Sequence, residues 1–183
     1  MSLEYALLGF LQYKPLSGYD MKKTFDSTVN HFWPADQSQI YRTLNKLTAE
    51  ELIDMELVIQ KDKPNSKIYF ITEKGKEEFL NWLKSPISMA TPRIPWLVHI
   101  YFAAELSDDV IISILEKVAD QIRDRINSME KTTRSVFITD AKPLTSRDLF
   151  FKELTYDYGI TINNAILHWI EKVIEQIQKG EYQ

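Results

Sequence analysis

The feature that most constrains the fold is a helix pattern followed directly by two strand patterns in the N-terminal half. The amphipathic helix pattern begins at Asp36, and the segments 54–60 and 67–72 after it are rich in Ile, Val, Tyr and Phe. Residues 61–66 between them have turn composition, and Pro64 cannot donate to a strand ladder. We therefore expect a helix that runs into a β-hairpin.

This helix has clear signals for its first turn. Asp36 is a good N-cap, and Gln39 three positions later can complete a capping box. Pro34 stops a helix from continuing in from upstream. The helix, called the reading helix below, should begin near Asp36.

The reading helix has one apolar and one polar side when its residues are placed at about 100° per residue. The apolar side holds Ile40, Leu44, Leu47 and Glu51, and the opposite side holds Ser38, Arg42, Asn45 and Ala49. The exposed groups are a guanidinium, an amide, a hydroxyl and an ammonium, from Arg42, Asn45, Ser38 and Lys46, and they are of the types that read base edges or hold phosphates. Three lysines and one aspartate between residues 61 and 67 give the hairpin a net charge of +2, which suits a phosphate backbone. The predicted DNA-contacting residues are Gln37, Ser38, Gln39, Tyr41, Arg42, Asn45, Lys46, Lys61, Lys63, Asn65 and Lys67.

Further helix patterns surround these elements, at 3–11 and 19–29 before them and at 73–84 after them. This order is the layout of a winged helix-turn-helix, in which the hairpin is the wing. We expect a mainly α fold with a two-stranded wing that binds double-stranded DNA. Two alternatives remain open. The polar face of the helix can simply be a solvated surface, and a winged helix can serve as a protein–protein adaptor that binds no DNA. The formal net charge of −4 adds no support, so the hypothesis depends on local arrangement.

Residues 1–84 resemble the DNA-binding domain of PadR-type transcriptional regulators. The resemblance rests on Leu-Leu-Gly-Phe-Leu at 7–11, Ser-Gly-Tyr-Asp at 17–20, Ile-Tyr-Arg-Thr-Leu-Asn-Lys-Leu at 40–47 and Lys-Ile-Tyr-Phe-Ile-Thr at 67–72. The resemblance is greatest to the longer branch, typified by the virulence-gene activator, through Phe32-Trp33, the Tyr-Arg-x-Leu-Asn-Lys core at 41–46 and Lys63-Pro64 of the wing. The resemblance implies a transcriptional regulator with a helical C-terminal half that makes a homodimer, and an effector that is a flat aromatic compound.

Pro86, Pro92 and Pro95 interrupt helical periodicity after the first domain. We expect a DNA-binding domain at 1–84, a linker at 85–95 and a helical dimerisation domain at 96–183. Ser107 caps one long helix, and the Thr145-x-x-Asp148 signal precedes a second that runs to about residue 178. At 1.5 Å per residue the second helix would be roughly 50 Å long, more than a small domain can cover within one chain.

Apolar residues recur at three- and four-residue intervals along both long helices and predict seams for partner helices. The predicted dimerisation residues are Ile111, Leu115, Val118, Ile122, Ile126, Met129, Leu154, Tyr158, Ile162, Ile166, Trp169, Val173 and Ile177. These stripes can bury against each other as an antiparallel pair, or against the same helices of a second subunit. We expect a mixture of the two, with a homodimer as the working unit on a (pseudo)palindromic operator.

Aromatic residues flank the linker on both sides. Trp82 precedes it, and Trp96, His99 and Phe102 follow it, so they are candidates for a pocket that takes a small aromatic effector. Packing in a core is the alternative reading of the same residues.

Composition argues against other classes of function. The absence of cysteine excludes a disulfide framework and a thiol nucleophile, and the three histidines and five scattered glycines form no metal or phosphate-loop motif. We therefore expect no enzyme, no metal and no cofactor. The chain starts without a basic, hydrophobic leader, and its most apolar run, 95–106, is too short for a bilayer, which needs about 20 apolar residues. A cytoplasmic protein without membrane contact is the expectation.

Overall fold

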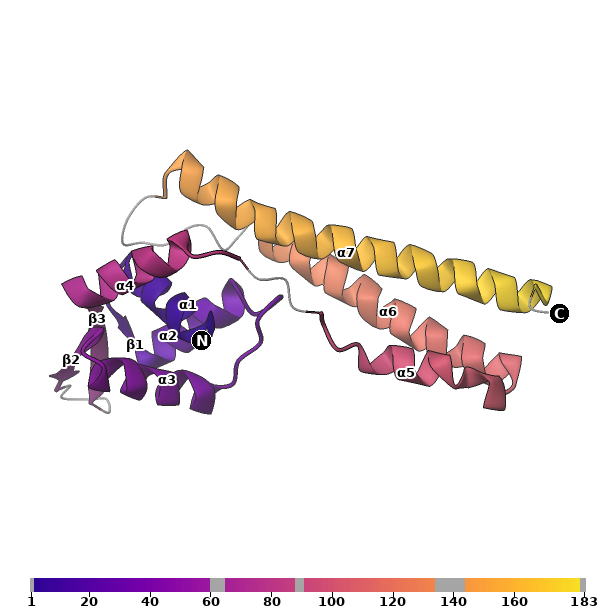
Figure 1. Ribbon diagram of the computed structural model, residues 1–183, viewed down its shortest axis with the longest axis horizontal. Helices are drawn as coiled ribbons and strands as arrows, with labels where there is room; N and C mark the ends of the chain where they lie inside the picture. The colour runs from indigo at the N-terminus through magenta and orange to yellow at the C-terminus, as the bar shows by residue number, and fades with distance from the viewer. Residues whose placement is uncertain (1, 60–64, 88–90, 134–143, 182–183) are drawn as a thin grey trace. The chain divides into compact units, whose positions relative to one another are not determined.

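The structure is a computed structural model that describes residues 2–59, 65–87, 91–133 and 144–181 (Figure 1). It divides into two compact units, which are described separately. The elements of the first unit are α1 (Ser2–Leu11), β1 (Leu16–Ser17), α2 (Gly18–Ser27), α3 (Gln37–Ala49), β2 (Ile53–Val58), β3 (Ser66–Ile71) and α4 (Glu73–Lys84). Those of the second are α5 (Pro95–Tyr101), the 3-10 helix η1 (Ala103–Glu105), α6 (Asp108–Thr133) and α7 (Ser146–Lys179).

The first unit closes around an apolar core supplied by α1, α2, α3 and the sheet. The apolar side of α3 lies in this core as predicted, since Ile40 and Leu44 are 0% exposed and Leu47 is 1% exposed. Glu51 was wrongly assigned to that side: α3 ends at Ala49, and Glu51 is an exposed residue with φ of 59°, outside the helix. The helix is thus shorter than its pattern predicted, and its buried stripe stops at Leu47.

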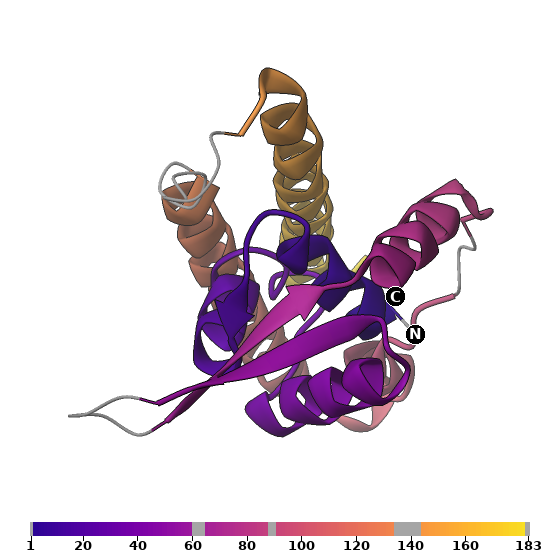
Figure 2. The ribbon, with the colours of Figure 1, turned by 90° about the vertical axis from the view of Figure 1, so that its left-hand side faces the viewer.

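The sheet of this unit is antiparallel with the strand order β1-β3-β2 (Figure 2). The wing is formed by β2 and β3, as expected, with Ile53 opposite Ile71 at one end and Val58 opposite Ser66 at the other. The sequence did not reveal β1, because a strand of two residues is too short to produce an alternating pattern. β1 matters for the site, since it joins the start of α2 to the wing.

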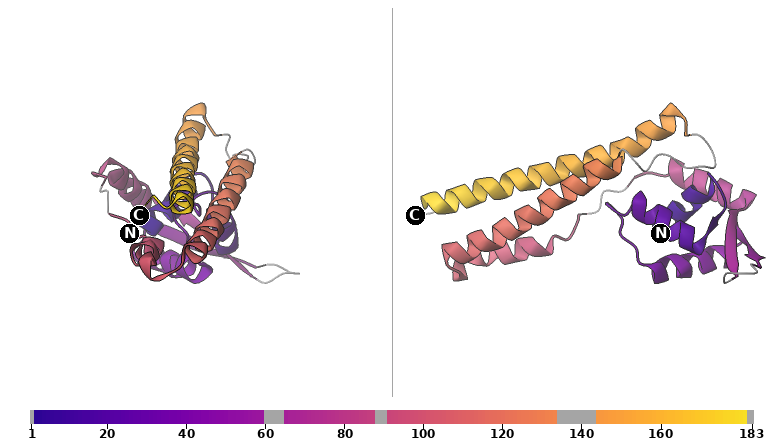
Figure 3. Two further views of the ribbon diagram at one scale, coloured as in Figure 1. Left: turned by 90° about the vertical axis from the view of Figure 1, so that its right-hand side faces the viewer. Right: turned by 180° about the vertical axis from the view of Figure 1, so that it is seen from behind.

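The second unit is built on α6 and α7, which run side by side in opposite directions (Figure 3). Leu115, Ala119 and Ile122 of α6 form a buried cluster with Ile170 of α7. The expected mainly α fold, with a winged helix-turn-helix followed by long antiparallel helices, is confirmed. No helix in the described ranges is long and apolar enough to cross a lipid bilayer.

Candidate nucleic-acid interface

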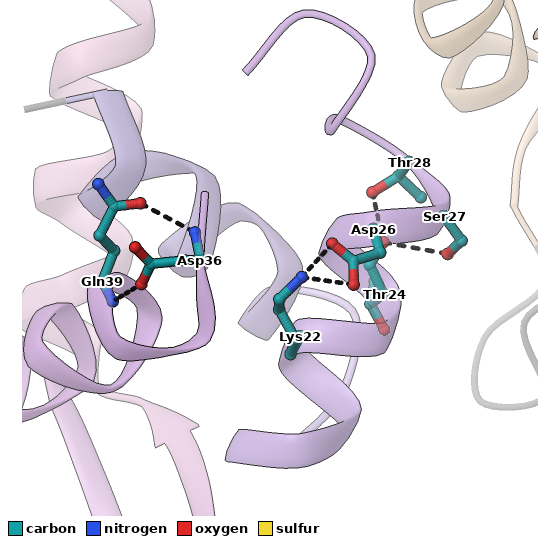
Figure 4. A network of polar contacts seen from close by, with 7 residues as sticks. All are labelled: Lys22, Thr24, Asp26, Ser27, Thr28, Asp36 and Gln39. Carbon is teal, nitrogen blue, oxygen red and sulfur yellow. Dashed lines mark hydrogen bonds and ion pairs between the residues drawn. The ribbon is translucent and has the colours of Figure 1, made fainter. Parts of the chain in front are cut away.

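The first turn of α3 is held by the capping box that its sequence predicts (Figure 4). The backbone N–H of Gln39 donates to Asp36 Oδ1 at 2.7 Å, and the backbone N–H of Asp36 donates to Gln39 Oε1 at 2.9 Å. The carbonyl oxygen of the Gln39 side chain is therefore engaged in the cap, and its amide NH₂ group is the part that remains for a ligand. The capping box therefore fixes the residue at which α3 begins.

The outer face of α3 presents polar side chains to solvent. Gln37, Ser38, Arg42 and Asn45 are all exposed, while the opposite side of the helix is buried. Arg42 and Asn45 are three residues apart and so lie on the same surface of the helix. Together they offer the five donors of a guanidinium and both the donor and acceptor of an amide.

Lys46 lies at the end of this face, but its charge already has carboxylate partners. Its Nζ is 2.6 Å from Glu4 Oε1 on α1 and 3.6 Å from Glu50 Oε1. The hydrogen bond to Glu4, together with the charges of both glutamates, raises the pKa of the Lys46 ammonium. Since both partners are solvent-accessible, DNA phosphates can compete for Lys46, but at the cost of breaking these pairs.

The wing contributes Asn65 and Lys67, whose side chains are exposed, whereas the predicted contacts Lys61 and Lys63 lie outside the described residues. Residues opposite each other in an antiparallel pair share a face of the sheet. Lys67 pairs with Leu57 and lies on the same face as Tyr69, which is buried in the core. The acidic residues Asp54 and Glu56 are on the other face, so the charge of Lys67 is displayed toward the side of the sheet that carries α3.

Helix α2 adds candidates that the sequence reasoning missed. Tyr19, Lys22, Lys23, Asp26 and Ser27 line a shallow hollow on its surface. Lys22 forms an ion pair with Asp26 (Figure 4), while Lys23 and Tyr19 are exposed. The available signal was the spacing of the buried Met21 and Phe25, which leaves the lysines outside. In helix-turn-helix proteins the helix before the reading helix crosses the DNA backbone, which is where such cations act.

The predicted effector residues have separate partners in the two units. The Trp82 ring stacks on Tyr5 with centroids 4.5 Å apart and an interplanar angle of 5°. Trp96 packs against Trp169 of α7 with centroids 5.7 Å apart, and His99 and Phe102 are exposed. Trp82 belongs to the first unit and the other three to the second, so their grouping into one pocket stays a prediction.

The predicted dimerisation residues fall into two groups. Most pack within the α6–α7 pair itself: Ile111, Leu115, Val118, Ile122, Ile126, Ile166, Val173 and Ile177 belong to its core cluster or lie against it, and Met129 is buried. The others are large and exposed: Leu154 (44%), Tyr158 (61%), Ile162 (42%) and Trp169 (39%). Among the predicted dimerisation residues, these four present the most exposed apolar surface.

Comparison with known proteins identifies the family. The model of the transcriptional regulator PadR-like family matches residues 7–81, and that of the virulence activator alpha C-term family matches residues 92–178. The negative transcriptional regulator PadR of Bacillus subtilis (strain 168) is 33% identical over 184 residues, covering 97% of this chain and 98% of the relative. The chain belongs to the PadR-like family. The C-terminal match also confirms the resemblance to the longer, virulence-activator branch.

Solved structures of this PadR relative have the same fold. The crystal structure of Bacillus subtilis PadR in complex with operator DNA superimposes with a TM-score of 0.83 at 26% identity and covers 97% of this chain and 99% of that chain. The structure of the same protein in complex with p-coumaric acid gives a TM-score of 0.77 at 24% identity, with 97% and 99% covered. The name of this relative describes it as a negative regulator of transcription.

Proposed function

We propose that this member of the PadR-like family is a DNA-binding transcriptional regulator that acts as a homodimer on a (pseudo)palindromic operator. The observation that carries the proposal is the exposed Arg42–Asn45 surface of α3, combined with a wing that displays Lys67 on the same side of the sheet. The structure of the Bacillus subtilis relative with operator DNA supports it. In this proposal residues 1–84 form the DNA-binding domain, residues 85–95 form the linker, and residues 96–183 form the dimerisation domain.

The reading helix α3 enters the major groove, where each base pair presents its own pattern of donors and acceptors. Arg42 can form two hydrogen bonds with the O6 and N7 atoms of guanine, and Asn45 can form two with the N6 and N7 atoms of adenine. Gln37 and Ser38 lie in the first turn beside the base edges or phosphates. Lys67, the other wing lysines and Lys23 of α2 neutralise backbone phosphates, which adds affinity without sequence information.

The second unit supplies the two-fold axis of the complex. A single reading helix covers one half-site, and a dimer places two of them in successive major grooves about 34–36 Å apart. The exposed residues Leu154, Tyr158, Ile162 and Trp169 of α7 support this assembly, because burial of such surface drives association.

Substitutions on the two elements test the division between base and backbone contacts. Arg42→Ala or Asn45→Ala should cost about 1–3 kcal/mol of specific binding and relax sequence preference. Lys67→Ala should weaken all duplexes alike and reduce the salt dependence, with a slope change of about 1. Fluorescence anisotropy with a selected duplex and a random duplex, across a salt series, measures both effects. Equal loss of preference in both variants contradicts the division of roles.

The same titration separates DNA binding from the adaptor alternative. Binding to duplex DNA depends steeply on salt because counterions are released from the phosphates. A winged helix that contacts only a partner protein would bind no duplex even at low salt.

We further propose that a small aromatic compound controls DNA binding, with Trp82, Trp96, His99 and Phe102 as the candidate contacts. The support is the p-coumaric acid complex of the Bacillus subtilis relative and the aromatic character of these residues. A titration with a panel of aromatic acids, followed by tryptophan fluorescence and thermal shift, should give a saturable response. A flat response to the whole panel contradicts control by this class of compound.

A further inference from the structure

The first residue of α2, Gly18, is packed directly against a tyrosine of the reading helix. A Cβ atom built on Gly18 would lie 2.5 Å from Cε1, 2.7 Å from Cζ and 2.8 Å from the hydroxyl oxygen of Tyr41. Real Cβ atoms essentially never approach other atoms this closely. Gly18 is not among the residues with positive φ, so its φ angle does not require a glycine. The reason for a glycine at this position is the space that the Tyr41 ring occupies.

The same short segment is tied to the wing. Leu16 and Ser17 of β1 pair with Tyr69 and Ile68 of β3, the strand that continues from the wing turn. Ser17 also begins α2, because its Oγ accepts a hydrogen bond from the backbone N–H of Asp20 at 3.0 Å. Residues 16–18 thus connect three elements: the wing through the β1–β3 ladder, α2 through its N-cap, and α3 through Tyr41.

We infer that Gly18 is a positioning residue that sets the reading helix relative to the wing by allowing the Tyr41 ring to lie directly on the start of α2. The inference rests on the proposed function. A side chain at position 18 has to displace the Tyr41 ring and so removes the contact that holds α3 against the start of α2, while the ladder keeps β1 and the wing in place. Base contacts made by α3 should then lose their alignment, whereas phosphate contacts tolerate a small shift, because they depend less on direction.

The readout is therefore sequence preference, defined as the affinity for a selected duplex divided by that for a random duplex of equal length. The full-length wild-type protein first selects its duplex from a random-sequence pool, and anisotropy then measures both affinities well below the unfolding temperature of each variant. We expect Gly18→Ala to lower the preference by at least about tenfold, equivalent to about 1.4 kcal/mol. In a Tyr41→Ala background the same change should lower it by less than about twofold, because the ring that it displaces is gone.

Gly9→Ala is the matched control. It is the same substitution in a helix of the same unit, and its Cβ would lie 3.3 Å from the tip of the Phe79 ring, a contact that a shift of a few tenths of an ångström relieves. The preference of this variant should stay within about twofold of the wild-type value.

The outcomes separate cleanly. A substitution that only lowers the folded fraction weakens both duplexes equally, so an unchanged preference in Gly18→Ala overturns the inference, as do additive effects in the double variant. If Gly18→Ala does not fold, a double variant that folds and keeps its preference within about twofold of that of Tyr41→Ala supports the inference, and a double variant that also fails to fold overturns it. A wild-type protein that binds no duplex overturns the proposed function as well, whereas full preference in Gly18→Ala overturns the inference alone.

Discussion

The two units close their cores to different degrees. Among the described residues, the first unit has a cluster of twelve buried hydrophobic residues drawn from three helices, the sheet and Ala35 before α3, and the second has a cluster of four drawn from α6 and α7. The second unit also leaves large apolar side chains exposed, including Phe102 at 64% and Tyr158 at 61%. Two helices can cover only one side of each other, whereas three helices around a sheet enclose a core. The first unit therefore encloses its core within one chain, although α4 also exposes large apolar side chains such as Leu83 at 56%, and the second unit has only the facing sides of two helices to bury.

A charge placed on the exposed α7 surface should have the largest effect. In the proposed dimer Ile162→Glu buries an unpaired carboxylate, which should raise the dimer dissociation constant by at least about 100-fold, or about 2.7 kcal/mol. Sedimentation at micromolar concentration should then show a monomer where the wild-type protein is a dimer. Thr161→Glu, at the exposed neighbouring position, is the control and should remain dimeric. A wild-type monomer at that concentration contradicts the assembly.

The next largest effect is expected from shortening a buried side chain in the core of the first unit. Leu44 is 0% exposed in α3, so Leu44→Ala removes buried methyl groups and leaves a cavity, which should lower the free energy of unfolding by about 2–5 kcal/mol. Leu80→Ala in α4, where the side chain is 51% exposed, should cost less than about 1 kcal/mol. Urea unfolding of both variants measures the contrast. Similar losses would contradict the exposure of Leu80 and mean that α4 is covered in solution.

The capping box should contribute less than the core. Asp36→Ala leaves the backbone N–H of Gln39 without its acceptor and should lower the free energy of unfolding by about 0.5–2 kcal/mol. Asp36→Asn keeps a capping oxygen and should recover most of the loss. Urea unfolding measures both, and equal losses would show that charge and not the hydrogen bond carries the effect.

The smallest effect concerns Tyr5, whose hydroxyl donates to Glu78 Oε1 at 2.9 Å between α1 and α4. This hydrogen bond, with burial and the nearby glutamates, raises the pKa of Tyr5 above its ordinary value of 10.0. The folded state thus holds the proton more tightly than the unfolded state, so the stabilisation is complete below pH 10 and is lost as the pH rises through the raised pKa.

Tyr5→Phe should therefore lower the free energy of unfolding by about 0.5–1.5 kcal/mol at neutral pH. The difference from wild type should shrink as the solution becomes alkaline, which urea unfolding at several pH values measures. Tyr101→Phe, at a side chain 82% exposed in the second unit, is the control and should change little at any pH. A difference that grows with pH would contradict the assignment.

Several parts of the first unit follow from its sequence because their causes are local. The Asp36–Gln39 capping box joins residues three apart, and the buried stripe of α3 recurs every three or four residues. The bounds of α4, Glu73–Lys84, match the predicted range, and the structure shows Thr72 as the N-cap just before them. The strand β1 escaped prediction because it depends on pairing with β3, more than fifty residues further along the chain.

The candidate site shows the same division. The polar residues on the outside of α3 could be predicted, because burial of Ile40, Leu44 and Leu47 settles which side faces solvent. The partners of individual side chains could not. Lys46 meets Glu4, 42 residues away, and Tyr41 lies on Gly18.

The sequence by itself determined the order of the main helices and the wing strands, the first turn of the reading helix and the family of this protein. These properties depend on backbone propensity, capping and periodicity, which act within one or two turns of chain. The tertiary structure alone decided which lysine is paired, which ring packs on the glycine of α2, and which apolar residues of α6 and α7 remain exposed. Those outcomes depend on contacts between residues distant in sequence, and no local pattern encodes which of several similar side chains will meet.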